Sequence, residues 1–139
     1  MSSMAYWKSK CEGFVKINEF AQLKGQVLKS IKQVGSDEIH MELESGDKFK
    51  LYHEQDCCEC VTVEDITGNL EDLVGSPLLM AEEVSNSDEP GIGYSEDSPH
   101  ESYTWTYYKF ATIKGYVTIR FYGYSNGYYS ERVTFGEVT

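Results

Sequence analysis

Residues 103–135 read YTWTYYKFATIKGYVTIRFYGYSNGYYSERVTF. Three runs in this stretch are rich in Tyr, Thr, Val, Ile and Phe, and they span 103–111, 116–124 and 128–135. Lys114-Gly115 and Asn126-Gly127 separate the runs, and such pairs close tight turns between antiparallel strands. The stretch therefore predicts a three-stranded antiparallel meander.

The alternation of apolar and polar residues selects the register of the second hairpin. A two-residue turn at Asn126-Gly127 would place an apolar residue opposite Arg132, whereas a three-residue loop over 125–127 places Ile119 opposite Val133. The same loop brings Val117 opposite Phe135. We therefore predict the three-residue loop, with Gly127 in the left-handed conformation.

The same alternation, applied to the hairpin of 103–111 and 116–124, places Ala111 opposite Tyr116. The predicted core face then consists of Tyr108, Phe110, Val117, Ile119 and Phe121. The opposite face is aromatic and basic, and in this register Tyr107, Arg120 and Arg132 form one row.

This second face is the candidate binding site. Like charges that oppose each other in a sheet are unfavourable unless an anion lies between them, and rings beside guanidinium groups stack bases and hold phosphates. The pattern predicts a site for a small nucleotide-like anion, and its candidate residues are Trp105, Tyr107, Arg120, Tyr122, Tyr124, Asn126, Tyr128 and Arg132. An alternative is that the chain's own acidic segment packs over this face, or that Tyr and Arg form a solvated surface.

Length and composition predict one domain, 1–139, with a single core. The chain contains no apolar run of about 18 residues and no charged leader followed by an apolar stretch, so neither a membrane span nor an export signal is expected. Its 4 cysteines are too few for a disulfide scaffold, which favours a cytoplasmic location.

The net charge of −11 is concentrated in one segment, because 19 of the 23 acidic residues lie between 37 and 101. Such acidity disfavours direct binding to nucleic acid. It suits an inhibitor that imitates nucleic acid towards a host protein, although a solubilising surface is the simpler explanation.

The rest of the chain predicts further strands and two short helices. A hairpin of 38–44 and 47–53 would place Leu43 opposite Phe49, Met41 opposite Leu51, Glu44 opposite Lys48 and Glu42 opposite Lys50. We predict strands at 26–34, 61–66 and 78–84, short helices over 19–24 and 69–74 capped by Asn18 and Asn69, and a polar acidic loop at 85–102. The predicted class is α+β, mostly antiparallel β-sheet.

One motif stands apart from this pattern. His53-Glu54-Gln55-Asp56-Cys57-Cys58-Glu59 resembles the H-x-Q-D-C-C-E motif of a small, uncharacterised family in phage and prophage genomes. Similarity extends through 63–66, 70–77 and the S-N-G-Y-Y-S segment 125–130. The resemblance implies a phage or prophage accessory protein, present in the host cytoplasm, and it brings no established activity.

The motif also contains potential metal ligands and nucleophiles. His53, Asp56, Cys57 and Cys58, with Cys60, are residue types that bind zinc, but no second Cys or His pair follows at the usual spacing. Asp56 could instead orient His53 towards the Cys57 thiol for nucleophilic catalysis. Adjacent cysteines also pack as small buried apolar residues. We expect no metal, no cofactor and no catalytic residue.

These observations lead to one hypothesis and two alternatives. The hypothesis is a non-enzymatic phage counter-defence protein that captures a small nucleotide-like signal. The alternatives are an acidic protein-interaction inhibitor and a thiol or metal-dependent enzyme centred on His53 and Cys57.

Overall fold

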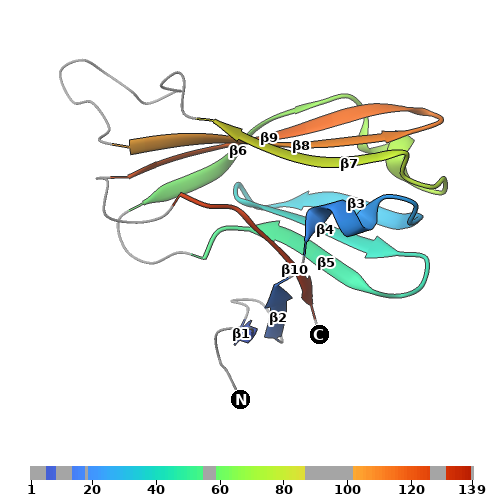
Figure 1. Cartoon of the computed structure of the whole chain (residues 1–139), viewed down its shortest axis with the longest axis horizontal. Helices are drawn as coiled ribbons and strands as arrows, with labels where there is room; N and C mark the ends of the chain where they lie inside the picture. The colour runs from blue at the N-terminus through green and yellow to red at the C-terminus, as the bar shows by residue number, and fades with distance from the viewer. Residues whose placement is uncertain are drawn as a thin grey trace.

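Two antiparallel sheets stack face to face in the computed structural model, which describes residues 6–8, 14–17, 19–54, 59–86, 102–125 and 131–138 (Figure 1). The first sheet has the order β1 (Tyr6–Lys8), β2 (Phe14–Ile17), β10 (Thr134–Val138), β5 (Lys48–Tyr52), β4 (Glu38–Leu43), β3 (Leu28–Val34). The second has the order β6 (Cys60–Thr67), β9 (Gly115–Ser125), β8 (Ser102–Thr112), β7 (Met80–Asn86).

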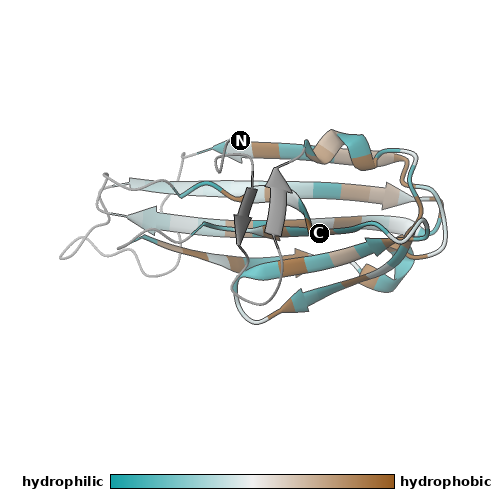
Figure 2. Cartoon of the chain, turned by 90° about the horizontal axis from the view of Figure 1, so that it is seen from below, coloured by the Kyte–Doolittle hydropathy of each residue, from teal (hydrophilic) through white to brown (hydrophobic). Residues whose placement is uncertain are grey.

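The core lies between the two sheets. Hydrophobic and hydrophilic residues alternate along the strands, as Figure 2 shows, so each strand turns one set of side chains inward. Ile39, Leu51, Tyr108, Phe110 and Ile119 are each fully buried. Burying these faces against each other stabilises the sandwich, because apolar area removed from water contributes roughly 25 cal/mol per Å².

The β8–β9 hairpin confirms the predicted register. Ala111 pairs with Tyr116 and Tyr107 pairs with Arg120, and the connection is a short turn at Ile113-Lys114. The five residues predicted for the core face are all buried. The alternation of apolar and polar residues predicted this register correctly because a short turn leaves few alternative pairings.

The predicted third strand of the meander is wrong. β10 pairs with β2 and β5 in the other sheet, and Phe135 lies opposite Leu51. The second neighbour of β9 is β6, so Ile119 lies opposite Ile66 and not opposite Val133. Phe135 instead stacks on Phe49, with ring centroids 5.0 Å apart, which buries both rings in the shared core. The predicted loop at 125–127 falls mostly outside the described residues.

The β4–β5 hairpin forms with a register two residues away from the predicted one. Met41 pairs with Phe49 and Glu42 with Lys48, and Gly46 in the connecting turn has a φ of +98°. A shift of two residues leaves every side chain on the same face, so the apolar face and the charged face are both preserved. Alternation therefore could not distinguish the two registers.

The predicted helices are single 3₁₀ turns, η1 (Phe20–Leu23) and η2 (Leu70–Leu73), so the structure is mostly antiparallel β and lacks the helical part of the α+β prediction among the described residues. The cap at Asn69 is confirmed, because its side chain accepts a hydrogen bond from the Glu71 amide at 3.0 Å. Asn18 and most of the 85–102 loop lie outside the described residues; 85 and 86 end β7, and 102 begins β8. No helix in the described part is long and apolar enough to cross a membrane.

Two glycines with similar backbone angles test the contact between the β6–η2 connection and β9. Gly68 has a φ of +102°, and a Cβ there would collide with the carbonyl of Tyr116, whereas Gly46 has a φ of +98° and open space around it. We expect Gly46→Ala to lower the free energy of unfolding by about 1–2 kcal/mol and Gly68→Ala to lower it by about 1–3 kcal/mol more. Urea denaturation measures both. Equal losses would contradict the close approach at Gly68.

Candidate functional site

A cluster of aromatic rings covers the outer face of the four-stranded sheet. Trp105 lies opposite Tyr122 in the β8–β9 register, with ring centroids 4.6 Å apart. Tyr124 and Tyr103 lie 5.8 Å and 6.5 Å from the Tyr122 ring. Tyr122 is only 3% exposed, while the three rings around it are half-buried. We call Tyr103, Trp105, Tyr107, Arg120, Tyr122 and Tyr124 the aromatic face.

Arg120 joins this cluster to the acidic segment. Its guanidinium lies over the Trp105 ring, 5.1 Å from the centroid, and its Nη2 donates to Glu64 Oε1 at 2.7 Å. Asp65 Oδ2 is 4.0 Å from the same nitrogen. A bulge in β6 between Val63 and Asp65 directs both carboxylates towards Arg120. One of the two alternatives for this face, a contact with the acidic segment, is therefore present at Arg120.

Of the remaining predicted site residues, the structure describes Arg132 alone. Arg132 does not share a row with Tyr107 and Arg120, because it is an exposed residue just before β10, and β10 belongs to the other sheet. The strand opposite Arg120 on its other side supplies Asp65 instead. Asn126 and Tyr128 lie outside the described residues. The separation follows from β10 joining the other sheet, which breaks the predicted row.

The two ends of the H-x-Q-D-C-C-E motif meet in a buried pair. The His53 side chain is 5% exposed and that of Glu59 is 1% exposed, and His53 Nε2 is 2.7 Å from Glu59 Oε2. His53 Nδ1 donates to the carbonyl of Arg132 at 2.7 Å. Both ring nitrogens therefore have protein partners, and the pair joins the end of β5 to the segments that enter β6 and β10.

This arrangement bears on the proposed zinc and thiol chemistry. A zinc ligand needs a free imidazole nitrogen, and His53 offers none in this arrangement. The part of the chain that the structure describes holds no group of three or more His, Cys, Asp or Glu residues placed to bind a metal ion. Asp56, Cys57 and Cys58 lie outside that part.

A second buried carboxylate lies near the same end of the sandwich. Glu131 accepts hydrogen bonds from Thr104 Oγ1 at 2.8 Å and from Ser125 Oγ at 2.5 Å. Its Cβ lies so close to Gly123 that any side chain at that glycine would clash. Sequence reasoning missed Glu59 and Glu131 as functional candidates, although Glu59 ends the motif that carried the family resemblance and Glu131 directly follows the segment 125–130.

Cys60 and Tyr124 connect the motif to the aromatic face. They lie directly opposite each other in the β6–β9 register, and a hydrogen bond with Cys60 raises the pKa of the Tyr124 hydroxyl above its usual value. This hydrogen bond links the end of the motif segment to the edge of the ring cluster.

A family model described as "Domain of unknown function (DUF7448)" matches residues 15–135, which is most of the chain. The chain belongs to this family. No curated protein and no solved structure matches the DUF7448 chain. The matched range includes the His53–Glu59 pair, Glu131 and the whole aromatic face. The family description assigns no activity, and the phage origin stays a prediction.

The buried pair of the DUF7448 domain makes a prediction about stability. His53→Leu removes the imidazole that faces the Glu59 carboxylate, and we expect a loss of about 3–5 kcal/mol, because breaking a buried pair leaves a charge without its counterpart. The double variant His53→Leu/Glu59→Leu should be more stable than His53→Leu alone. Chemical denaturation of the two single variants and the double variant measures the coupling. Additive losses would show that the two side chains do not interact.

Proposed function

We propose that this DUF7448 protein is a non-enzymatic binding protein of phage or prophage origin, which captures a small nucleotide-like ligand on its aromatic face in the host cytoplasm and so interferes with a host pathway. The observation that supports ligand binding is the ring cluster of Trp105, Tyr122 and Tyr124 with Arg120 stacked on it. The phage setting rests on the motif resemblance, and a counter-defence role rests on analogy with other small phage proteins.

Base stacking supplies the first part of the affinity. Tyr103, Trp105 and Tyr124 are half-buried, so each ring is held in place by Tyr122 while part of its surface remains open to solvent. Stacking of one base on such a ring contributes about 1–3 kcal/mol. A planar ring system is therefore the ligand group that best fits this face.

Arg120 supplies the second part of the affinity, and the ligand must compete with Glu64 for it. Its side chain is 37% exposed, and its Nε is a buried donor with no hydrogen-bond partner among the described residues. A guanidinium has five N–H donors, so a phosphate can bind it while Glu64 occupies one. The Glu64 carboxylate nevertheless repels that phosphate, which lowers the affinity for an anionic ligand.

Two variants with opposite expected effects test the proposal. Arg120→Ala should weaken nucleotide binding by about 1.5–3 kcal/mol, because it removes a charge-assisted hydrogen bond. Glu64→Gln should strengthen binding several-fold, because it removes the competing charge. Mono-, di- and cyclic nucleotides would be screened by thermal shift, and the dissociation constants of those that stabilise the wild type would be measured by titration calorimetry.

The controls change charge at a distance from the aromatic face. Lys32→Ala on β3 matches the charge lost in Arg120→Ala, and Glu44→Gln in the β4–β5 turn matches Glu64→Gln. Neither control should alter binding. A wild-type protein that no nucleotide stabilises, combined with a destabilised Arg120→Ala variant, would refute the proposal and show that the Arg120–Glu64 pair serves the fold alone.

A further inference from the structure

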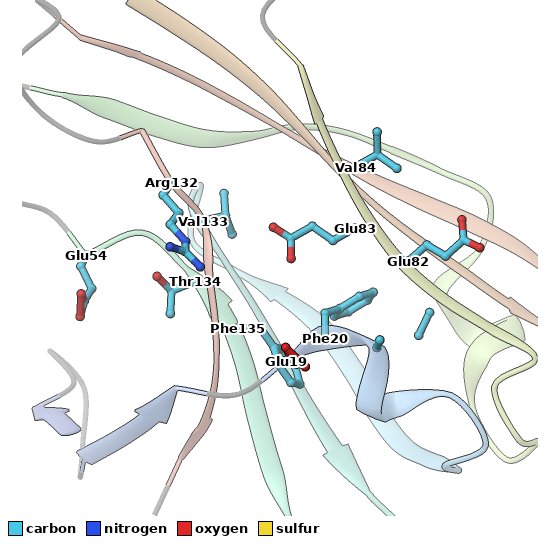
Figure 3. Close-up of a pocket in the computed structure, with 12 residues that line it drawn as sticks. Glu19, Phe20, Glu54, Glu82, Glu83, Val84, Arg132, Val133, Thr134 and Phe135 are labelled. Atoms are coloured by element: carbon cyan, nitrogen blue, oxygen red, sulfur yellow. The ribbon is translucent and has the colours of Figure 1, made fainter. Parts of the chain in front are cut away.

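A cavity of about 700 Å³ lies between the two sheets, on the side away from the aromatic face (Figure 3). It is bounded by η1, by the edge strand β7 and by the segment that enters β10. Its lining includes Glu19, Phe20, Glu54, Glu83, Arg132 and Phe135. This volume falls within the range of small-molecule sites, about 300–1,000 Å³.

Carboxylates from three separate elements surround the cavity. Glu83 lies opposite Tyr108 in the β7–β8 register and so faces inward, and Figure 3 shows it extending towards Arg132 across the cavity. Glu19, which directly precedes η1, and Glu54, which follows β5, also line it. Glu82 lies on the opposite side of β7, across from Lys109. The lining thus includes Glu19, Glu54 and Glu83 against the single cation Arg132, so carboxylates outnumber cations around the cavity.

The base of the cavity is aromatic. Phe20 and Phe135 meet edge to face with centroids 5.5 Å apart, and Phe20 also lies 4.8 Å from the Tyr108 ring. Burial, and then the neighbouring Glu83 carboxylate, raise the pKa of Tyr108 well above its usual range, so the phenol is a neutral donor beside Glu83. Carboxylates above aromatic rings form an environment that favours organic cations.

The positions of the carboxylates favour an organic cation over a metal ion as the ligand of the cavity. A metal ion needs several ligands that converge on one point, and none of the described residues form such a group. The carboxylates here come from three different segments of the chain, which suits a longer molecule with nitrogen groups at its ends and an apolar chain between them. Phe20 and Phe135 would then contact the apolar chain.

We propose that this cavity binds an organic cation with ammonium or guanidinium groups, held by Glu83 together with Glu19 and Glu54. Two sources share this chemistry, a free polyamine and a Lys or Arg side chain of a partner protein. The site is distinct from the aromatic face in position and in the charge of its ligand. Binding here therefore does not depend on nucleotide capture.

Titration calorimetry with two probes tests this proposal and separates the two sources. Spermidine represents a free polyamine, and acetyl-arginine amide represents a protein side chain. At about 0.15 M salt, which screens non-specific attraction to the acidic surface, we expect saturable binding of at least one probe to the wild type. Glu83→Gln should weaken that binding about tenfold, because it removes a charge-assisted contact.

Glu44→Gln is the matched control, because it removes the same charge from the β4–β5 turn and leaves the cavity lining unchanged. It should bind the probe as the wild type does. Glu54→Gln provides a second variant in case Glu83→Gln alters folding, which the melting temperature without probe reports. Failure of both probes to bind the wild type, or equal weakening by Glu44→Gln and the cavity variants, would overturn the proposal.

Discussion

Phe20 contacts aromatic rings from both sheets, and the sandwich depends on this junction. Its ring meets those of Tyr108 and Phe110 on β8 and that of Phe135 on β10, at centroid distances of 4.8 Å, 5.1 Å and 5.5 Å. Each contact is edge to face, the geometry that the charge distribution of aromatic rings favours. The 3₁₀ turn η1 therefore connects two sheets that share no strand, and it also forms one wall of the cavity.

Three buried polar side chains near one end of the sandwich make contacts between distant segments. His53 and Glu59 join β5 to β6, and Glu131 accepts from hydroxyl groups on β8 and β9. Buried carboxylates without such partners would cost several kcal/mol each. These contacts hold together one end of the sandwich at the segments that carried the family resemblance. These contacts give His53 and Glu59 a structural role.

The two candidate sites differ because the two faces of β8 have different environments. The outer face carries Trp105 and Tyr107, with Arg120 beside them on β9, and these residues favour planar ligands. On the inner face, Tyr108 lies close to Glu83, and the cavity nearby favours cations. Since successive side chains of a strand point to opposite faces, one strand can serve both surfaces. The two proposed sites can therefore lie on opposite faces of the same sheet.

The sequence by itself determined which side chains of β8 and β9 face inward. The period of two is a local property of extended backbone, and it correctly placed Tyr108, Phe110 and Phe121 in the core. The tight β8–β9 turn also determined the pairing of Ala111 with Tyr116. The ring cluster of Trp105, Tyr122 and Tyr124 followed from these two facts.

Only the tertiary structure decided which strands became neighbours. Alternation is the same whether Phe135 pairs with β9 or with β5, so it could not assign β10 to the six-stranded sheet or separate Arg132 from Arg120. The pairing of Arg120 with Glu64 likewise required β6 beside β9 and a bulge in β6. Which strands pair depends on burying the combined apolar surface of distant segments, and a local sequence pattern contains no information about that surface.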